Sequence, residues 1–253
     1  MAEWRVLRGW SPQELAPRLS ALSELDRNFD EPPEQLRAGA DWRYYESRGR
    51  IFVEEAGPPL EDGPFERLKQ AIADYRFSDP DIVQAHFDPD APLLGRSMLL
   101  ELKPFRLRYL CGVRVGALRD ELHDGHSVWG YRYDTLEGHM ESGAEWFLLD
   151  KDHESGEITF SITAHWRRGE FPNWWSRIGF DLLAPRYQRR WHRAAQRRLT
   201  AIALKGAGAG AGLGEGAGED RGEGRGEGGG EGLGGGEGRG RSRGTGAGAG
   251  RPG

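Results

Sequence analysis

The sequence predicts an α+β domain in which a curved antiparallel sheet wraps on a long C-terminal helix. Three observations support this prediction: two amphipathic segments near the N-terminus, six segments of strand-like character with no helical pattern between them, and a final segment of helical periodicity. Successive strands without intervening helices form an antiparallel meander rather than a parallel α/β sheet. A long amphipathic helix needs an apolar surface to lie on, so we expect a helix-grip arrangement.

The first helix is predicted at about residues 12–25. Ser11 can cap it, Pro12 suits the first helical position, and Glu14 completes a capping box. Leucines then recur on one helical face, at Leu15, Leu19, Leu22 and Leu25.

Three segments follow before the sheet region. Residues 28–39 are expected to form a loop, because they contain a Pro-Pro pair. Residues 42–55 are rich in aromatic and β-branched side chains, which predicts a hairpin or a bent strand. A second helix is predicted over about residues 64–77, with an inner face made of Phe65, Leu68, Ile72 and Tyr75.

After Pro80 the hydrophobic period changes to two, and turn residues separate several of the segments. In residues 157–166, apolar side chains alternate with polar ones, which predicts a strand with one buried face and one solvent-exposed face. The six predicted strands are Ile82–Phe87, Ser97–Lys103, Leu107–Leu118, Ser127–Thr135, Gly143–Leu149 and Glu157–Trp166.

The last predicted element is the C-terminal helix, with Trp191 and Leu199 as its expected anchors in the core. Pro185 is expected to kink this helix or to split it in two. Its apolar residues recur at steps of three to five, at Trp175, Ile178, Leu182, Tyr187, Trp191, Ala195, Leu199 and Ile202.

Composition divides the chain into one domain, residues 1–205, and a tail, residues 206–253. Half of the 48 tail residues are glycine and none is aromatic. Such a segment cannot bury enough apolar surface to offset the entropy of ordering it, so we expect the tail to be disordered. Its Gly-x-Gly spacings do not indicate a nucleotide site, because no strand precedes them and no helix follows.

Charge and cysteine content narrow the function classes. The whole chain carries a net charge of −5, so we expect the arginines near the C-terminus to cover a helix and pair with an acidic body rather than bind nucleic acid. No long apolar run predicts a membrane span, and no secretory signal is apparent, so we expect a cytoplasmic protein. The single cysteine, Cys111, is expected to be buried and inert.

The densest motif is Tyr133-Asp134-Thr135-Leu136-Glu137-Gly138-His139-Met140-Glu141-Ser142-Gly143. This run resembles the Tyr-x-Thr-Leu-x-Gly-His-x-Glu-x-Gly signature of an uncharacterised bacterial and plant family, which is grouped with the START-like, birch-pollen-allergen-like and polyketide-cyclase-like superfamily. The resemblance is strongest over residues 113–202. It implies a helix-grip fold and carries no established reaction. Asp134 and Ala144 depart from the usual family residues.

Two candidate site residues lie in this motif. His139 and Glu141 are two positions apart, so an extended segment projects both to one face. Glu145 can join them if the chain folds back at Gly143. Three interpretations stay open: a general acid–base pair, part of a metal site, or a turn that Gly138 permits and these side chains stabilise. No metal-ligand spacing supports the second, so neither a metal nor another cofactor is expected.

Aromatic side chains supply the other candidates. Tyr131 and Tyr133 share one face of their predicted strand and can point either into a cavity or outward. The Trp174-Trp175 pair is interpreted as core, with a pocket lip as the alternative. His86 and His165 are expected to be exposed or hydrogen-bonded rather than catalytic.

The leading functional hypothesis is a binding protein for a small hydrophobic molecule or lipid, held in a cavity between the sheet and the C-terminal helix. Its predicted polar contacts are Tyr131, Tyr133, His139 and Glu141. The second hypothesis, which the resemblance alone implies, is a cyclase- or hydrolase-like enzyme that uses His139 with Glu141 or Glu145. The third is a structural or interaction domain whose cavity is filled by its own tryptophans. The sequence predicts no oligomeric state.

Overall fold

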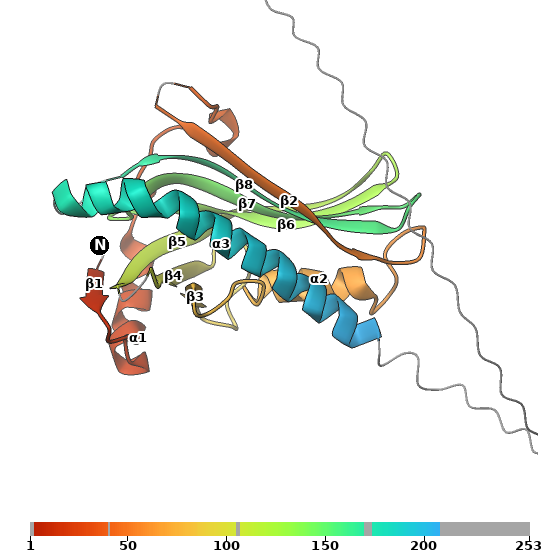
Figure 1. Ribbon diagram of the computed structural model, residues 1–253, viewed down its shortest axis with the longest axis horizontal. Coiled ribbons are helices and arrows are strands. Elements are labelled where there is room, and N and C mark those ends of the chain that lie inside the picture. Colours follow the sequence, from red (N-terminus) through yellow and green to blue (C-terminus); the bar gives the residue numbers. More distant parts are fainter. Residues whose placement is uncertain (1–2, 40, 105–106, 170–173, 208–253) are drawn as a thin grey trace, which may run out of the picture. The chain divides into compact units, whose positions relative to one another are not determined.

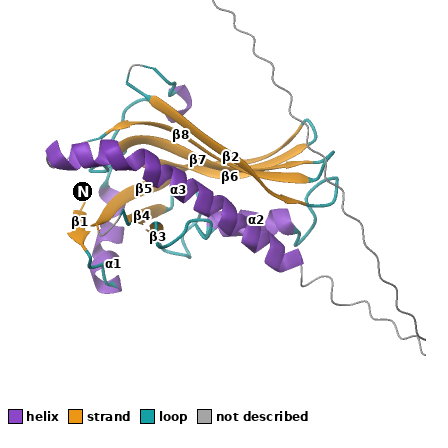
Figure 2. Ribbon diagram, in the orientation of Figure 1, coloured by secondary structure: helices purple, strands orange, loops and turns teal. Residues whose placement is uncertain are grey.

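The computed structural model describes residues 3–39, 41–104, 107–169 and 174–207, and only the backbone of residues 174–185 and 206–207. The described residues form one antiparallel sheet of eight strands together with three α-helices and two short 3-10 helices (Figures 1 and 2). The strands are β1 (Glu3–Val6), β2 (Arg43–Val53), β3 (Val83–His86), β4 (Ser97–Leu102), β5 (Leu107–His123), β6 (His126–Thr135), β7 (Glu141–Asp152) and β8 (Glu157–Arg168). The helices are α1 (Pro12–Ala21), η1 (Leu22–Glu24), η2 (Pro33–Gln35), α2 (Pro64–Ala73) and α3 (Trp174–Ala207).

The sheet confirms the predicted meander. Its strand order is β2-β8-β7-β6-β5-β4-β3, so every strand from β3 to β8 lies beside its neighbour in sequence. Figure 1 shows α3 running across one face of this sheet, with α2 beside the later part of the helix. The helix-grip arrangement is therefore confirmed.

Two strands extend the prediction. Of the two alternatives for residues 42–55, the structure has the single strand β2 and not the hairpin, and β2 pairs with β8 along its length, with one irregularity between Arg50 and Phe52. The N-terminal strand β1 was not predicted, because four residues are too few to show a period. It adds to the sheet by pairing with β5.

The start of α1 follows from its sequence. The Ser11 hydroxyl accepts a hydrogen bond from the Glu14 backbone N–H (3.3 Å), and the Glu14 carboxylate accepts one from the Ser11 N–H (2.8 Å). The predicted capping box is therefore confirmed. The α-helix ends at Ala21, and η1 continues the turn to Glu24.

The second helix is shorter than predicted. It ends at Ala73, and Tyr75 takes a left-handed conformation with φ of 57°. The Arg76 N–H then closes the turn on the Ala71 carbonyl oxygen (2.8 Å). This reversal places the Tyr75 ring against Phe77 and Phe147, inside the domain.

The last helix crosses the sheet without a break. Residues 174–207 form one helix, so of the two outcomes predicted at Pro185 the split does not occur, and the kink stays a prediction. Trp191 and Leu199 are both buried, as predicted, and the Trp191 indole N–H donates to the Ser78 hydroxyl (2.8 Å). The helix surface on the sheet side is completed by the small buried residues Ala194, Ala195 and Ala203.

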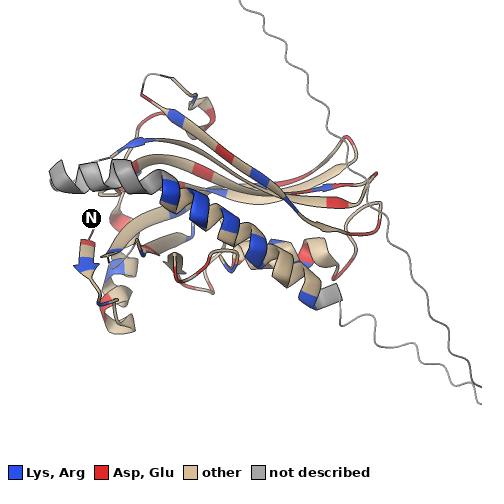
Figure 3. Cartoon of the chain, in the orientation of Figure 1, with Lys and Arg blue, Asp and Glu red and all other residues tan. Residues whose placement is uncertain are grey.

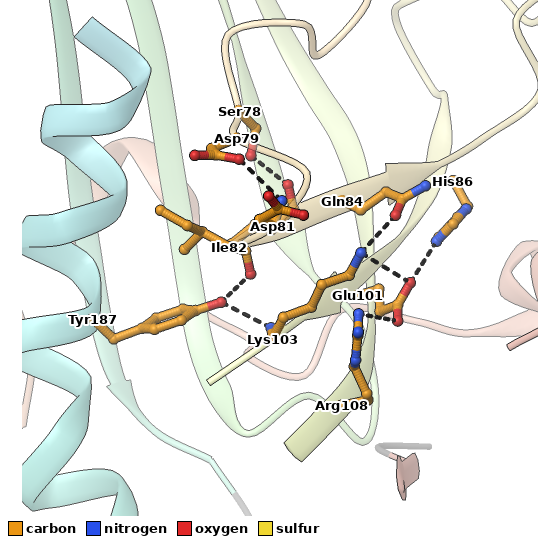
Figure 4. Close-up of polar contacts among 11 residues, drawn as sticks. Ser78, Asp79, Asp81, Ile82, Gln84, His86, Glu101, Lys103, Arg108 and Tyr187 are labelled. Carbon is orange, nitrogen blue, oxygen red and sulfur yellow. Dashed lines mark hydrogen bonds and ion pairs between the residues drawn. The ribbon is translucent and has the colours of Figure 1, made fainter. Parts of the chain in front are cut away.

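Tyr187 joins α3 to the edge of the sheet through two hydrogen bonds (Figure 4). Its hydroxyl donates to the Ile82 carbonyl oxygen and accepts a hydrogen bond from the Lys103 N–H (2.9 Å). Both backbone groups belong to the connections that flank β3 and β4. One side chain therefore ties the helix to two edge segments.

Both faces of the sheet carry apolar side chains. The main core lies between the sheet, α2 and α3 and includes Phe65, Phe77, Phe147 and Trp191. A second cluster packs α1 and η1 against the other face, through Leu22, Leu99, Leu110 and Leu136. The sheet is thus covered on the α3 face along its length and on the opposite face near α1.

The basic residues of α3 line its exposed side (Figure 3). We expected these arginines to pair with an acidic body. Within the described residues no ion pair joins any of them to a carboxylate, so that pairing is not observed. The exposed basic residues of α3 are Arg186, Arg189, Arg190, Arg193, Arg197, Arg198 and Lys205.

Candidate functional site

A cavity of about 100 Å³ lies between the sheet and α3. From the helix, Tyr187, Gln188 and Trp191 line it, and Leu100 and Leu102 of β4 contribute apolar surface. The remaining lining residues come from the turn after α2 and from β3, β6, β7, β8 and the β6–β7 connection: Tyr75, Val83, Tyr133, Thr135, His139, Met140, Glu141, Gly143, Ala144, Glu145, Ala164, His165 and Trp166.

Strand β7 brings two carboxyl groups into the cavity. Glu141 and Glu145 are four residues apart on one strand, so both side chains project from the same face. The anticipated fold-back at Gly143 is not needed. Gly143 has another role: a Cβ atom there would lie 2.2 Å from the His165 carbonyl oxygen, so only glycine allows β7 and β8 to approach this closely.

Burial shifts the pKa of both carboxyl groups upward. Protein atoms surround each side chain while solvent still reaches it, and this desolvation raises the pKa of Glu141 to about 7. Desolvation raises the pKa of Glu145 to about 8, which the hydrogen bond from the Tyr133 hydroxyl partly opposes and the charge of Glu141 increases. At neutral pH Glu145 therefore holds its proton, and Glu141 titrates close to neutrality.

His139 stabilises the turn that leads into β7. Gly138 has a φ of 75°, and the Glu141 backbone N–H donates to His139 Nδ1 (3.0 Å). Burial lowers the pKa of His139 to about 4, so the imidazole is neutral. Among the described contacts His139 bonds the Glu141 backbone and neither carboxyl group, so the acid–base pair considered from the sequence is not assembled.

The two predicted tyrosines have different positions. Tyr133 lines the cavity and bonds Glu145, whereas Tyr131 is packed behind it and donates to the Ile72 carbonyl oxygen (3.4 Å). Tyr75 was predicted only as an inner-face residue of the second helix, yet its ring also lines the cavity. The Tyr75 hydroxyl is buried and has no hydrogen-bond partner among the described residues.

Other predicted candidates lie in or near this region. His165 lines the cavity, and its ring packs at a tilt of 44° against the Tyr44 ring, with centroids 5.0 Å apart. His86 bonds Glu101 (3.2 Å) on β4 and is not among the lining residues. Cys111 is buried, and burial raises the pKa of its thiol to about 12. The side chains of Trp174 and Trp175 lie outside the described residues.

Two other kinds of site are absent from the described residues. No group of three or more His, Cys, Asp or Glu side chains there has the arrangement to hold a metal ion. No helix in the same part of the chain combines the length and apolar character needed to cross a membrane.

Comparison with known families decides the relationship that the motif suggested. The family described as a domain of unknown function (DUF1990) matches residues 31–199. The chain belongs to the DUF1990 family. The matched region includes β2 to β8, all the described lining residues of the cavity and most of α3. No curated protein matches the chain.

Solved structures resemble the DUF1990 chain only distantly. A major latex-like protein from Panax ginseng is 10% identical, with 65% of this chain and 99% of that one covered and a TM-score of 0.40. A norcoclaurine synthase from Thalictrum is 6% identical, with 67% and 98% covered and a TM-score of 0.41. A hypothetical protein from Helicobacter pylori is 14% identical, with 70% and 98% covered and a TM-score of 0.41. The helix-grip assignment therefore rests on the sheet and helix described above.

Proposed function

We propose that this DUF1990 protein binds a small, largely apolar molecule in the cavity between the sheet and α3. The walls supply apolar and aromatic surface, and a few polar groups are placed among them, which is the usual composition of a small-molecule site. Tyr133 and Glu141 are the proposed contacts that the sequence identified, and Tyr75 and Glu145 join them. His139 shapes one wall, and Tyr131 supports Tyr133 from behind.

The observation that carries this proposal is the unpartnered hydroxyl of Tyr75. Its side chain is 5% exposed, and a buried polar group without a partner costs free energy in a finished core. Because the same side chain lines the cavity, a bound molecule can supply the missing hydrogen bond. A cavity volume of about 100 Å³ favours a small molecule over a lipid, since sites for drug-sized ligands usually exceed roughly 300 Å³.

The test is native mass spectrometry of the protein purified from its own host, with a cavity-filling variant alongside. Ala164 lines the cavity, and Ala164→Leu is expected to remove a co-purifying small molecule. Thr163→Leu is the matched control, because the neighbouring residue on β8 points to the opposite face. Retention of the same molecule by both variants would place it outside the cavity and contradict the proposal.

A further inference from the structure

The outer side of α3 carries a row of arginine side chains, visible as basic residues along the helix in Figure 3. Residues at steps of four, three and four fall nearly in line, because an α-helix turns by about 100° per residue. At a rise of about 1.5 Å per residue, the row extends over roughly 16 Å of the helix. It consists of Arg186, Arg190, Arg193 and Arg197, with Arg189 at its side, and we call these five exposed residues the arginine row.

The arginine row lies on the side of α3 that faces away from the cavity. Tyr187, Gln188 and Trp191 line the cavity, and Trp191 is buried, whereas all five arginines are exposed. One helix therefore presents two different surfaces, an inner one to the cavity and an outer one to solvent. A site at the arginine row goes beyond the proposed function and does not depend on it.

The carboxylates of the elements that contact α3 are engaged elsewhere or face away from the arginine row. Both α2 and β2 contact α3. Glu66 on α2 and Asp74 at its end each pair with a cation close by in sequence (3.2 and 3.3 Å). On β2, Ser47 bonds Gln196 of α3, so its neighbour Glu46 projects to the other face of the sheet.

The arrangement of the arginines suits a multivalent anion. The five side chains line one shallow hollow on the surface, and no other described residue lines it. Like charges three and four residues apart repel one another on a helix, so an anion that fills the hollow relieves this repulsion. The planar guanidinium group donates two parallel hydrogen bonds to a phosphate group. Several such groups around one hollow can bind several phosphates at once.

We propose that the arginine row binds a soluble chain of linked phosphate groups, in which the phosphates themselves are recognised. Single-stranded nucleic acid is less well matched, because proteins that bind it usually add aromatic side chains on which bases stack, and the hollow has none among its described lining residues. A lipid surface is also less well matched. Helices that lie in a membrane interface insert apolar side chains, whereas Trp191 and Leu199 of α3 are buried inside the domain.

The experiment is isothermal titration calorimetry of the full chain with inorganic tripolyphosphate and with orthophosphate at pH 7.5. Because the full chain is used, every carboxylate of the protein competes with the probe for the arginines. We expect tripolyphosphate to bind at least about tenfold more tightly than orthophosphate, since it can engage several guanidinium groups together. Raising the NaCl concentration from about 50 to about 200 mM should weaken its binding by at least about fivefold, because the site is exposed to screening.

Paired variants locate the site. The double variant Arg193→Gln with Arg197→Gln should weaken tripolyphosphate binding by at least about tenfold. Arg8→Gln with Arg50→Gln is the matched control, because it removes the same charge at side chains that are 79% and 67% exposed and lie outside α3. The control should change the affinity by less than about twofold. Tripolyphosphate should also raise the melting temperature of the wild-type protein and of the control, but not that of the α3 variant.

The outcomes decide between the possible partners. Failure of tripolyphosphate to bind at millimolar concentration would overturn the proposal, as would an equal loss of affinity in both double variants, which would indicate overall charge rather than the arginine row. Two further probes are a single-stranded RNA oligonucleotide and vesicles that contain phosphatidylserine. Binding of either one that tripolyphosphate does not displace would overturn the proposal in favour of a nucleic acid or a lipid surface.

Discussion

Replacing Glu145 by glutamine should stabilise the ligand-free protein at alkaline pH. The native pKa of this carboxyl group is raised to about 8 from 4.5. Between these values the unfolded chain has lost a proton that the folded chain still holds. Stability from this group is therefore present below about pH 4.5 and declines as the pH rises towards 8. Glutamine has nearly the same shape and cannot ionise, so the variant should escape this decline.

The magnitude follows from the same pKa values. A rise from 4.5 to about 8 corresponds to about 5 kcal/mol at 1.36 kcal/mol for each pH unit. Solvent reaches the Glu145 side chain through the cavity, which reduces the penalty for charge, so we expect about half of this, ~2–3 kcal/mol. Burial lowers the pKa values of His139 and His192, so their contribution to the stability of the folded protein is lost as the pH falls. Both histidines are present in the variant, so this contribution cancels in the comparison.

The assay is urea unfolding of both proteins from pH 5 to pH 9, with the unfolding free energy obtained by linear extrapolation. We expect the two free energies to agree within about 0.5 kcal/mol at pH 5 and to diverge by ~2–3 kcal/mol at pH 9, with the glutamine variant more stable. Glu61→Gln, at an exposed position, is the matched control and should show no such divergence. A difference for Glu145→Gln that stays constant across this range would refute the claim that burial holds a proton on Glu145.

Three further results are expected. Trp191→Ala and Leu199→Ala should each lower the unfolding free energy by about 2–5 kcal/mol in urea titrations, because both side chains are buried between α3 and the sheet; changes below about 0.5 kcal/mol would show that the helix does not pack there. Lys151→Met should lower the unfolding free energy by about 3–5 kcal/mol at pH 7, because it leaves the Glu54 carboxylate buried without its cation. An unchanged unfolding free energy in the same assay would contradict that pairing. Cys111 should not react with a thiol reagent at pH 8 until the protein unfolds, and rapid labelling of the folded protein would show that the thiol is accessible.

Most of the sheet and the start of α1 could be predicted because local sequence determines them. The alternation of residues 157–166 gave β8, and the Ser11–Glu14 box gave the start of α1. The end of α2 could not be predicted in this way. Its periodicity continues to Phe77, but Tyr75 takes a left-handed conformation that tertiary packing supports and local propensity does not favour.

The candidate site was only partly predictable for a similar reason. Glu141 and Tyr133 were identified because they belong to one dense motif. The polar roles of Tyr75 and Tyr187 were not predicted, because each residue occupies an apolar position of a helical pattern. The surroundings of each hydroxyl are set by residues far away in the sequence. Tyr131 and Tyr133 lie on the same face of β6, as their spacing of two residues predicted. That spacing does not distinguish the tyrosine that lines the cavity from the one that packs behind it.

The position of α3 has a consequence for biosynthesis. Tyr187, Gln188 and Trp191 form one wall of the cavity, and all three follow the last strand in the chain. During translation the whole sheet emerges from the ribosome before this wall does, and in that interval only α2 covers its apolar face. A ligand therefore cannot assist the early folding of the nascent chain. A chain whose β8 has left the ribosome but whose Tyr187 has not would expose this open face, which chaperones must keep from aggregating.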